Sequence, residues 1–213
     1  MRTFETHSRT DRLVAKFSGV VNNLKSTVTE NGLVRLAFTA RTDDRGQILG
    51  SNETHTPDVL MYDRFWVRIW DQWVMPHRSV IFSATLRLSG GRYELIDSPY
   101  NILNSTAEQR LLECPSPLGG GDDFSLSNIS IAFVARDPRL NPAFNTASHI
   151  YIARYSEPSY LLKVNHGSGA SSSPSWSPDG KFLAFLEQRI PGHGTDSNHD
   201  PFSTNYRISR RGV

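Results

Sequence analysis

The sequence of 213 residues predicts an all-β protein, an incomplete β-propeller of roughly four blades that forms one domain over residues 1–213. A strand that reads apolar-Ala-Phe occurs three times, at 36–38, 131–133 and 183–185. A turn-forming segment precedes each copy, and long amphipathic helical patterns are absent. A repeat of roughly 40–50 residues with four strands per unit is typical of propeller blades, so a propeller is the predicted fold.

The third copy shows the repeated turn most clearly. Trp176 and Ser177 come first, followed by Pro178, Asp179 and Gly180. These last three residues suit a tight turn, because Pro presets φ at its second position and Gly accepts a left-handed backbone. We therefore predict a turn here that leads into the strand at 183–185.

The second copy aligns with the third at an offset of 52 positions, without a gap. Phe124 then matches Trp176, and Asn128 matches Gly180. Asn is the next-best residue after Gly for a left-handed backbone position. We therefore expect Asn128 to hold the same position in its turn as Gly180 does.

Further strands are predicted from alternating apolar residues. Residues 80–88 alternate as a half-buried strand does, and residues 92–96 follow across a Gly-Gly hairpin turn. Residues 149–155 and 160–164 form a second predicted pair, and 205–209 a last strand. The one candidate helix lies at 57–73.

A Trp-rich segment interrupts the strands, and residues 42–78 are predicted to be an insertion within the propeller. Three of the four tryptophans lie within eight residues, at positions 66, 70 and 73. The motif residues are Tyr62, Asp63, Trp66, Arg68, Trp70 and Asp71. We interpret the aromatic side chains as a cap on one end of the propeller core, with a ligand contact as the alternative. Local ion pairing with neighbouring arginines accounts for the two aspartates.

Composition gives no support for a nucleic-acid or membrane partner. The net charge is +2, and no apolar run approaches the roughly 20 residues of a membrane helix.

Cys114 is the single cysteine, so an internal disulfide is excluded and an inert thiol is expected. The side chains of His193, Asp196, His199 and Asp200 match no zinc or calcium spacing, so we predict no metal site and no cofactor.

The order of several segments resembles one family of peptidases. Residues 131–138, 150–152 and 171–174 agree with it, and residues 62–71 carry its rarest motif. That motif reads Tyr-Asp-x-Leu-Phe-Val-Arg-His-Trp-Asp in the fungal secreted dipeptidyl-peptidase V group, which are serine peptidases of the prolyl oligopeptidase family. Here Phe65-Trp66 replaces Leu-Phe, and Ile69 replaces His. The resemblance covers roughly residues 20–190.

The resemblance implies the N-terminal propeller of a secreted, two-domain serine peptidase that removes N-terminal dipeptides from peptides. The propeller would gate or dock the substrate, and a C-terminal α/β-hydrolase domain beyond Val213 would hold the catalytic residues. The 213 residues contain no Gly-x-Ser-x-Gly elbow, and Ser168 lacks its spacing, so no catalytic residue is assigned and the chain is expected to be inactive alone. The alternative is a stand-alone propeller that binds peptides or proteins as a scaffold.

Secretion is expected from the resemblance, although residues 1–20 carry basic side chains and no apolar core of a signal peptide. Asn52, Asn104 and Asn128 stand in Asn-x-Ser/Thr sites and are candidate glycosylation positions. Such sites also arise by chance, so they support secretion only weakly.

Overall fold

The computed structural model describes residues 2–5, 10–50, 59, 61–62, 68–69, 72–73, 77–117, 119–140, 147–165, 169–188 and 206–212. These residues form antiparallel strands and two short 3-10 turns, η1 (Gln109–Leu111) and η2 (Gly121–Asp123). The all-β prediction is therefore confirmed. Among the described residues there is no helix long and apolar enough to cross a membrane.

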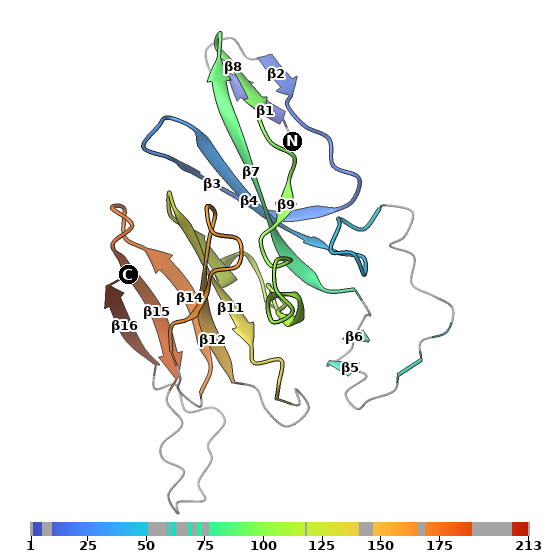
Figure 1. Ribbon diagram of the computed structural model, residues 1–213, viewed down its shortest axis with the longest axis vertical. Helices are drawn as coiled ribbons and strands as arrows, with labels where there is room; N and C mark the ends of the chain where they lie inside the picture. Colours follow the sequence, from blue (N-terminus) through green and yellow to red (C-terminus); the bar gives the residue numbers. More distant parts are fainter. Residues whose placement is uncertain are drawn as a thin grey trace, which may run out of the picture.

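Three sheets follow one another along the chain (Figure 1). The first sheet has the order β3 (Val21–Val28), β4 (Val34–Arg41), β7 (Ser79–Ser89), β8 (Arg92–Leu95), and β9 (Tyr100–Asn101) also pairs with β7. The second sheet has the order β10 (Phe124–Leu126), β11 (Ser130–Arg136), β12 (Ser148–Arg154), β13 (Leu161–Lys163). The third sheet has the order β14 (Ser171–Trp176), β15 (Phe182–Gln188), β16 (Tyr206–Gly212). Separate hairpins pair β1 (Arg2–Glu5) with β2 (Thr10–Leu13), and β5 (Arg68–Ile69) with β6 (Gln72–Trp73).

Each Ala-Phe pair lies in the second strand of its sheet, in β4, β11 or β15. The sheets are open, and none closes on itself within the described part of the chain. The repeated unit is thus an antiparallel meander that recurs in sequence order. The propeller itself, with its number of blades, stays a prediction.

The expectation for Asn128 is wrong. Gly180 has a φ of +69°, and its N–H donates to the Ser177 carbonyl at 2.8 Å, as a tight turn requires. Asn128 has no positive φ, because its turn closes two residues sooner, between Ser127 N and the Ser130 carbonyl at 2.8 Å. The 52-residue offset therefore aligns β11 with β15 but not the turns before them.

The core lies between successive sheets, so their middle strands are buried on both faces. In β7, residues 80–86 are all buried, whereas Leu88, at the end of the predicted alternation, is 54% exposed. The half-buried alternation expected there is thus wrong, because a second layer covers the other face. One apolar cluster contains side chains of both the first and the second sheet. Cross-strand rings stack within each sheet, Phe38 with Phe82 (5.8 Å) in the first and Phe133 with Tyr151 (5.7 Å) in the second. A second cluster joins the second and third sheets.

The Trp-rich segment is described only in part. The helix expected at 57–73 is contradicted by β5 and β6, which form a short hairpin. The rings of Tyr62 and Trp73 stack with centroids 6.3 Å apart, and Trp73 is 53% exposed. Asp63, Trp66, Trp70 and Asp71 lie outside the described residues, as does the side chain of Arg68. The cap over the core therefore stays a prediction.

Candidate binding site at the loop end of the sheets

The two ends of the sheets carry very different connections. The first and second strands are joined by short turns, at 29–33, 127–130 and 177–182. The second and third strands are joined through residues 42–78, 137–147 and 189–205. In Figure 1 these longer connections start at the lower ends of β4, β11 and β15. We call this the loop end, and binding residues are most often found on such loops above a rigid scaffold.

The opposite end is a packed structural layer. The Asn128 side-chain amide donates to Glu30 at 3.2 Å, which links the turn of the second sheet to that of the first. A Cβ on Gly180 would lie 3.4 Å from the Asn128 oxygen, so the turns of the second and third sheets also touch. The Trp176 N–H donates to the Ser125 hydroxyl at 3.2 Å. The repeated motif therefore holds neighbouring sheets together.

Asp179 stabilises the third turn from within. Its carboxylate accepts from the Ser177 hydroxyl at 2.5 Å and from the Lys181 N–H at 3.2 Å. These hydrogen bonds, that of Ser177 first, lower the pKa of Asp179. Pro178 is exposed in the same turn. The four motif residues from Trp176 to Gly180 thus serve the fold in this structure.

Two of the three glycosylation candidates are described. The Asn104 amide donates to the Arg45 carbonyl at 3.4 Å, and Asn128 is engaged with Glu30 as above. Both side chains are half-buried. A glycan on either amide nitrogen would replace these contacts. Asn52 lies outside the described residues, and glycosylation stays a prediction.

Glu113 is a carboxylate that lies against the start of β7 at the loop end. The Cys114 N–H donates to the Ser79 carbonyl at 2.9 Å, which fixes this segment against the start of β7. The Ser79 N–H in turn points to Glu113 Oε1 at 3.4 Å. Burial raises the pKa of Glu113 because it penalises the charged form. The Ser79 hydrogen bond and three nearby arginines oppose that shift.

Those arginines are Arg78, Arg136 and Arg41, and they come from two sheets. Arg41 ends β4 directly opposite Ser79 on β7, and Arg136 ends β11. Arg78 precedes β7 and donates to the Arg110 carbonyl at 3.0 Å. We call these three side chains around Glu113 the loop-end arginine cluster. It brings three positive charges to one negative charge at the seam between the first and second sheets.

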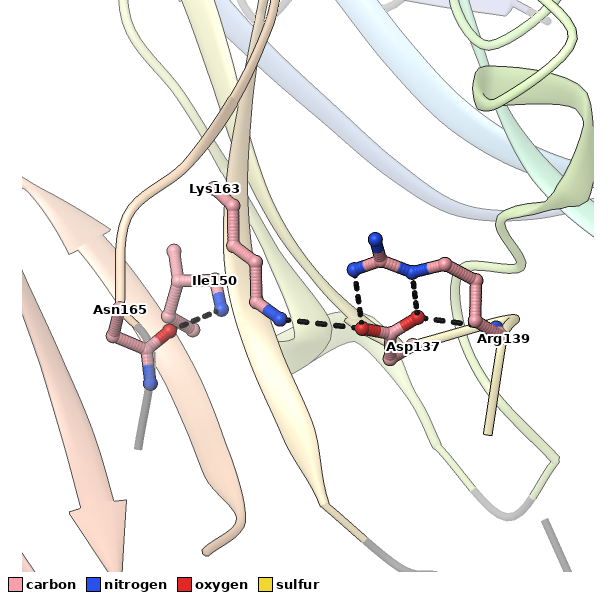
Figure 2. Close-up of polar contacts among 5 residues, drawn as sticks. All are labelled: Asp137, Arg139, Ile150, Lys163 and Asn165. Carbon is pink, nitrogen blue, oxygen red and sulfur yellow. Dashed lines mark hydrogen bonds and ion pairs between the residues drawn. The ribbon is translucent and has the colours of Figure 1, made fainter. Parts of the chain in front are cut away.

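A second carboxylate, Asp137, follows Arg136 and is fully engaged (Figure 2). The Arg139 side chain donates two hydrogen bonds to the Asp137 carboxylate, from Nε at 3.0 Å and from a terminal nitrogen at 2.8 Å. Lys163 adds a longer contact of 3.4 Å from β13. The Arg139 hydrogen bond is the main reason why the pKa of Asp137 lies well below its usual range. Asp137 therefore anchors the connection after β11 and has little capacity for another ligand.

Asn165 connects the second sheet to the third in the same region (Figure 2). Its oxygen accepts from the Ile150 N–H at 2.8 Å. Its nitrogen donates to the Ser171 hydroxyl at 2.8 Å and to Glu187 at 3.1 Å. All of these groups are buried, so we interpret Asn165 as a polar link between sheets.

The chemistry available at the loop end is the binding of anions. In the part of the chain that the structure describes, no group of three or more His, Cys, Asp or Glu side chains could hold a metal ion. Cys114 is buried, and burial raises the pKa of its thiol well above the ordinary value, which keeps it protonated and unreactive. Among the described residues at this end, Arg41 and Arg78 have exposed guanidinium groups, which can bind carboxylate or phosphate oxygens.

The sequence alone did not identify this cluster. Arg41, Arg78, Glu113 and Arg136 are far apart in the chain and form no motif. The three arginines share only one weak sequence feature, which is that each lies at or next to the end of a strand. His193, Asp196, His199 and Asp200 lie outside the described residues, as does Ser168.

Comparison with known proteins supports the resemblance read from the sequence. No family model matches the chain. The chain is 28% identical over 200 residues to dipeptidyl-peptidase 5 of Schizosaccharomyces pombe, which covers 92% of this chain and 27% of that protein. It is 28% identical to dipeptidyl-peptidase 5 of Aspergillus fumigatus over 86% of this chain and 27% of the relative. It is 30% identical to the Trichophyton equinum protein over 64% of this chain and 20% of the relative.

The chain thus spans about a quarter of the length of these relatives. Over that span it is a homologue of the fungal dipeptidyl-peptidases 5.

Proposed function

We propose that this chain is the N-terminal propeller portion of a secreted serine dipeptidyl-peptidase, which removes dipeptides from the N-termini of peptides. The observation that carries the proposal is the similarity to dipeptidyl-peptidase 5 over 92% of the chain. The recurrence of an antiparallel meander in three successive sheets, of five, four and three strands, supports it, since propeller blades are four-stranded antiparallel sheets.

Within such an enzyme the chain gates or docks the peptide and does not cleave it. The catalytic Ser, Asp and His then belong to an α/β-hydrolase domain encoded outside these 213 residues. The arginine side chains that lie near Glu113 suit the positioning of a substrate. Candidate glycans at Asn52, Asn104 and Asn128 are consistent with secretion.

Two measurements test this function. The coding region after the Val213 codon is expected to contain a Gly-x-Ser-x-Gly elbow followed by Asp and His in an α/β-hydrolase pattern. The purified 213-residue chain is expected to leave Lys-Ala and His-Ser dipeptidyl amides uncleaved. Turnover that a serine-directed inhibitor abolishes would refute the inactive-propeller assignment. A stop codon directly after Val213 in the mature transcript would favour a binding scaffold.

A further inference from the structure

Two hairpin turns at the end opposite the loop end contain a dipeptide that can form a cyclic imide. The turn between β3 and β4 contains Asn31-Gly32, and the turn between β14 and β15 contains Asp179-Gly180. These are the only Asn-Gly and Asp-Gly pairs in the sequence. A glycine favours imide formation because it has no Cβ to block the approach of its main-chain nitrogen to the preceding side chain.

The main chain of the two turns is almost the same. Gly32 has a φ of +72°, and Gly180 has a φ of +69°. The Gly32 N–H donates to the Thr29 carbonyl at 2.9 Å, and the Gly180 N–H donates to the Ser177 carbonyl at 2.8 Å. The attacking nitrogen is therefore restrained to a similar degree in both turns, and a difference in reactivity comes from the side chains and their surroundings.

The Asp179 side chain is held by its own turn. Its carboxylate accepts hydrogen bonds from the Ser177 hydroxyl and the Lys181 N–H. The same bonds, that of Ser177 first, lower the pKa of Asp179 and favour the ionised form, which a nitrogen nucleophile attacks poorly. A Cβ on Gly180 would lie 3.4 Å from Asn128 Oδ1, so the neighbouring turn also limits the space for a ring.

The Asn31 side chain has neither restraint. It is exposed, and it forms no hydrogen bond within the part of the chain that the structure describes. A Cβ on Gly32 would have no heavy atom within 4 Å beyond its chain neighbours, so the space for a ring is open. We propose that Asn31 is a site of spontaneous modification, at which the side-chain amide is converted through a cyclic imide to aspartate and isoaspartate. This inference goes beyond the proposed function and does not rest on it.

The reaction consumes water and releases ammonia. The Gly32 main-chain nitrogen attacks Asn31 Cγ, so that a C–N bond forms and the bond from Cγ to Nδ2 breaks. The amide proton of Gly32 leaves with Nδ2 as ammonia. Water then adds to one of the two imide carbonyls and breaks its bond to the nitrogen. Opening at the side-chain carbonyl gives aspartate, and opening at the main-chain carbonyl gives isoaspartate, whose main chain runs through the β-carbon.

Isoaspartate at position 31 lengthens the main chain within a closed turn. The Thr29 N–H donates to the Leu33 carbonyl at 2.8 Å across this turn. Glu30, directly before the modified position, accepts from the Asn128 amide at 3.2 Å and so links the first sheet to the second. We expect the longer main chain to strain both contacts. Modification therefore loosens a contact between sheets, although the unmodified Asn31 side chain contributes nothing to it.

The proposal is tested by ageing the complete 213-residue chain at mildly alkaline pH, folded and, in parallel, unfolded in urea. Trypsin releases residues 26–35 and 164–181, which separate the two dipeptides. Mass spectrometry with fragmentation and methylation by an isoaspartyl methyltransferase then measure isoaspartate at each position. We expect folding to raise the ratio of product at position 31 to product at position 179 by at least about tenfold, because the hydrogen bonds to the Asp179 carboxylate must break before it reacts.

An equal ratio in the folded and unfolded chain would overturn the proposal, because reactivity would then follow from the sequence alone. More product at position 179 than at position 31 in the folded chain would also overturn it. Asn31→Gln is the matched control for the effect on the fold, since its longer side chain keeps the amide but forms the ring far more slowly. The aged wild-type chain is expected to unfold at a lower urea concentration than the fresh chain, whereas aged Asn31→Gln is expected to remain unchanged. The same loss in both chains would refute the effect on the contact between sheets.

Discussion

Removal of the Asn165 side chain tests whether neighbouring sheets depend on one buried polar link. Asn165 is 8% exposed and makes three hydrogen bonds, one to Ile150 of the second sheet and two to Ser171 and Glu187 of the third. In Asn165→Ala the Ile150 N–H loses its acceptor, and Ile150 is fully buried. An unsatisfied buried group costs about 1–3 kcal/mol, and a lost hydrogen bond to a charged group such as Glu187 adds about 1.5–3 kcal/mol.

We therefore expect Asn165→Ala to lower the free energy of unfolding by about 3–5 kcal/mol. That is a large part of the roughly 5–15 kcal/mol that stabilises a typical domain. Urea unfolding monitored by tryptophan fluorescence measures the loss. Asn31→Ala is the control, because Asn31 is exposed in the β3–β4 turn, and a change within about 0.5 kcal/mol is expected there.

Asn165→Asp removes the hydrogen-bond donor of the side chain and keeps its acceptor. The aspartate keeps an oxygen for the Ile150 N–H, but it cannot donate to Ser171, and it places a carboxylate beside Glu187. It is expected to be at least as destabilising as Asn165→Ala at neutral pH. Free energies of unfolding within about 0.5 kcal/mol of the wild type for both variants would refute the inter-sheet link.

Two further predictions concern the ends of the sheets. The lowered pKa of Asp137 means that its contribution to stability is present above the ordinary carboxyl pKa and is lost as the pH falls toward the folded value. Asp137→Asn should therefore cost about 1 kcal/mol at neutral pH and progressively less between about pH 5 and about pH 2, as urea unfolding across this range measures. A cost that stays constant with pH would contradict the ion-pair explanation. Gly180→Ala should lose about 1–2 kcal/mol in thermal or urea unfolding, because φ is +69° there, whereas Gly120→Ala, at a φ of −151°, should change stability by less than about 0.5 kcal/mol. Equal effects at the two glycines would show that backbone strain is not the cause.

Local sequence patterns were enough to locate most strands. The Ala-Phe repeats lie in β4, β11 and β15, and the Gly90-Gly91 turn joins β7 to β8 with φ values of +55° and +73°. These features depend on residues close in sequence, where turn chemistry and alternation act directly. The burial of β7 on both faces was not predicted, because the residues that pack against it come from segments distant in the sequence.

The candidate site could not be predicted in the same way, and the reason is topological. Residues 41 and 78 become neighbours only when β4 pairs with β7, and residue 136 joins them only when the second sheet packs on the first. Glu113 carries no motif of its own, and its place against Ser79 follows from a backbone hydrogen bond of Cys114. The Trp-rich segment and the repeated turn, by contrast, identified the relatives because they are continuous in sequence. Continuous motifs in this chain therefore indicate relatives and strands, whereas Arg41, Arg78 and Arg136 come together only through strand pairing and sheet packing.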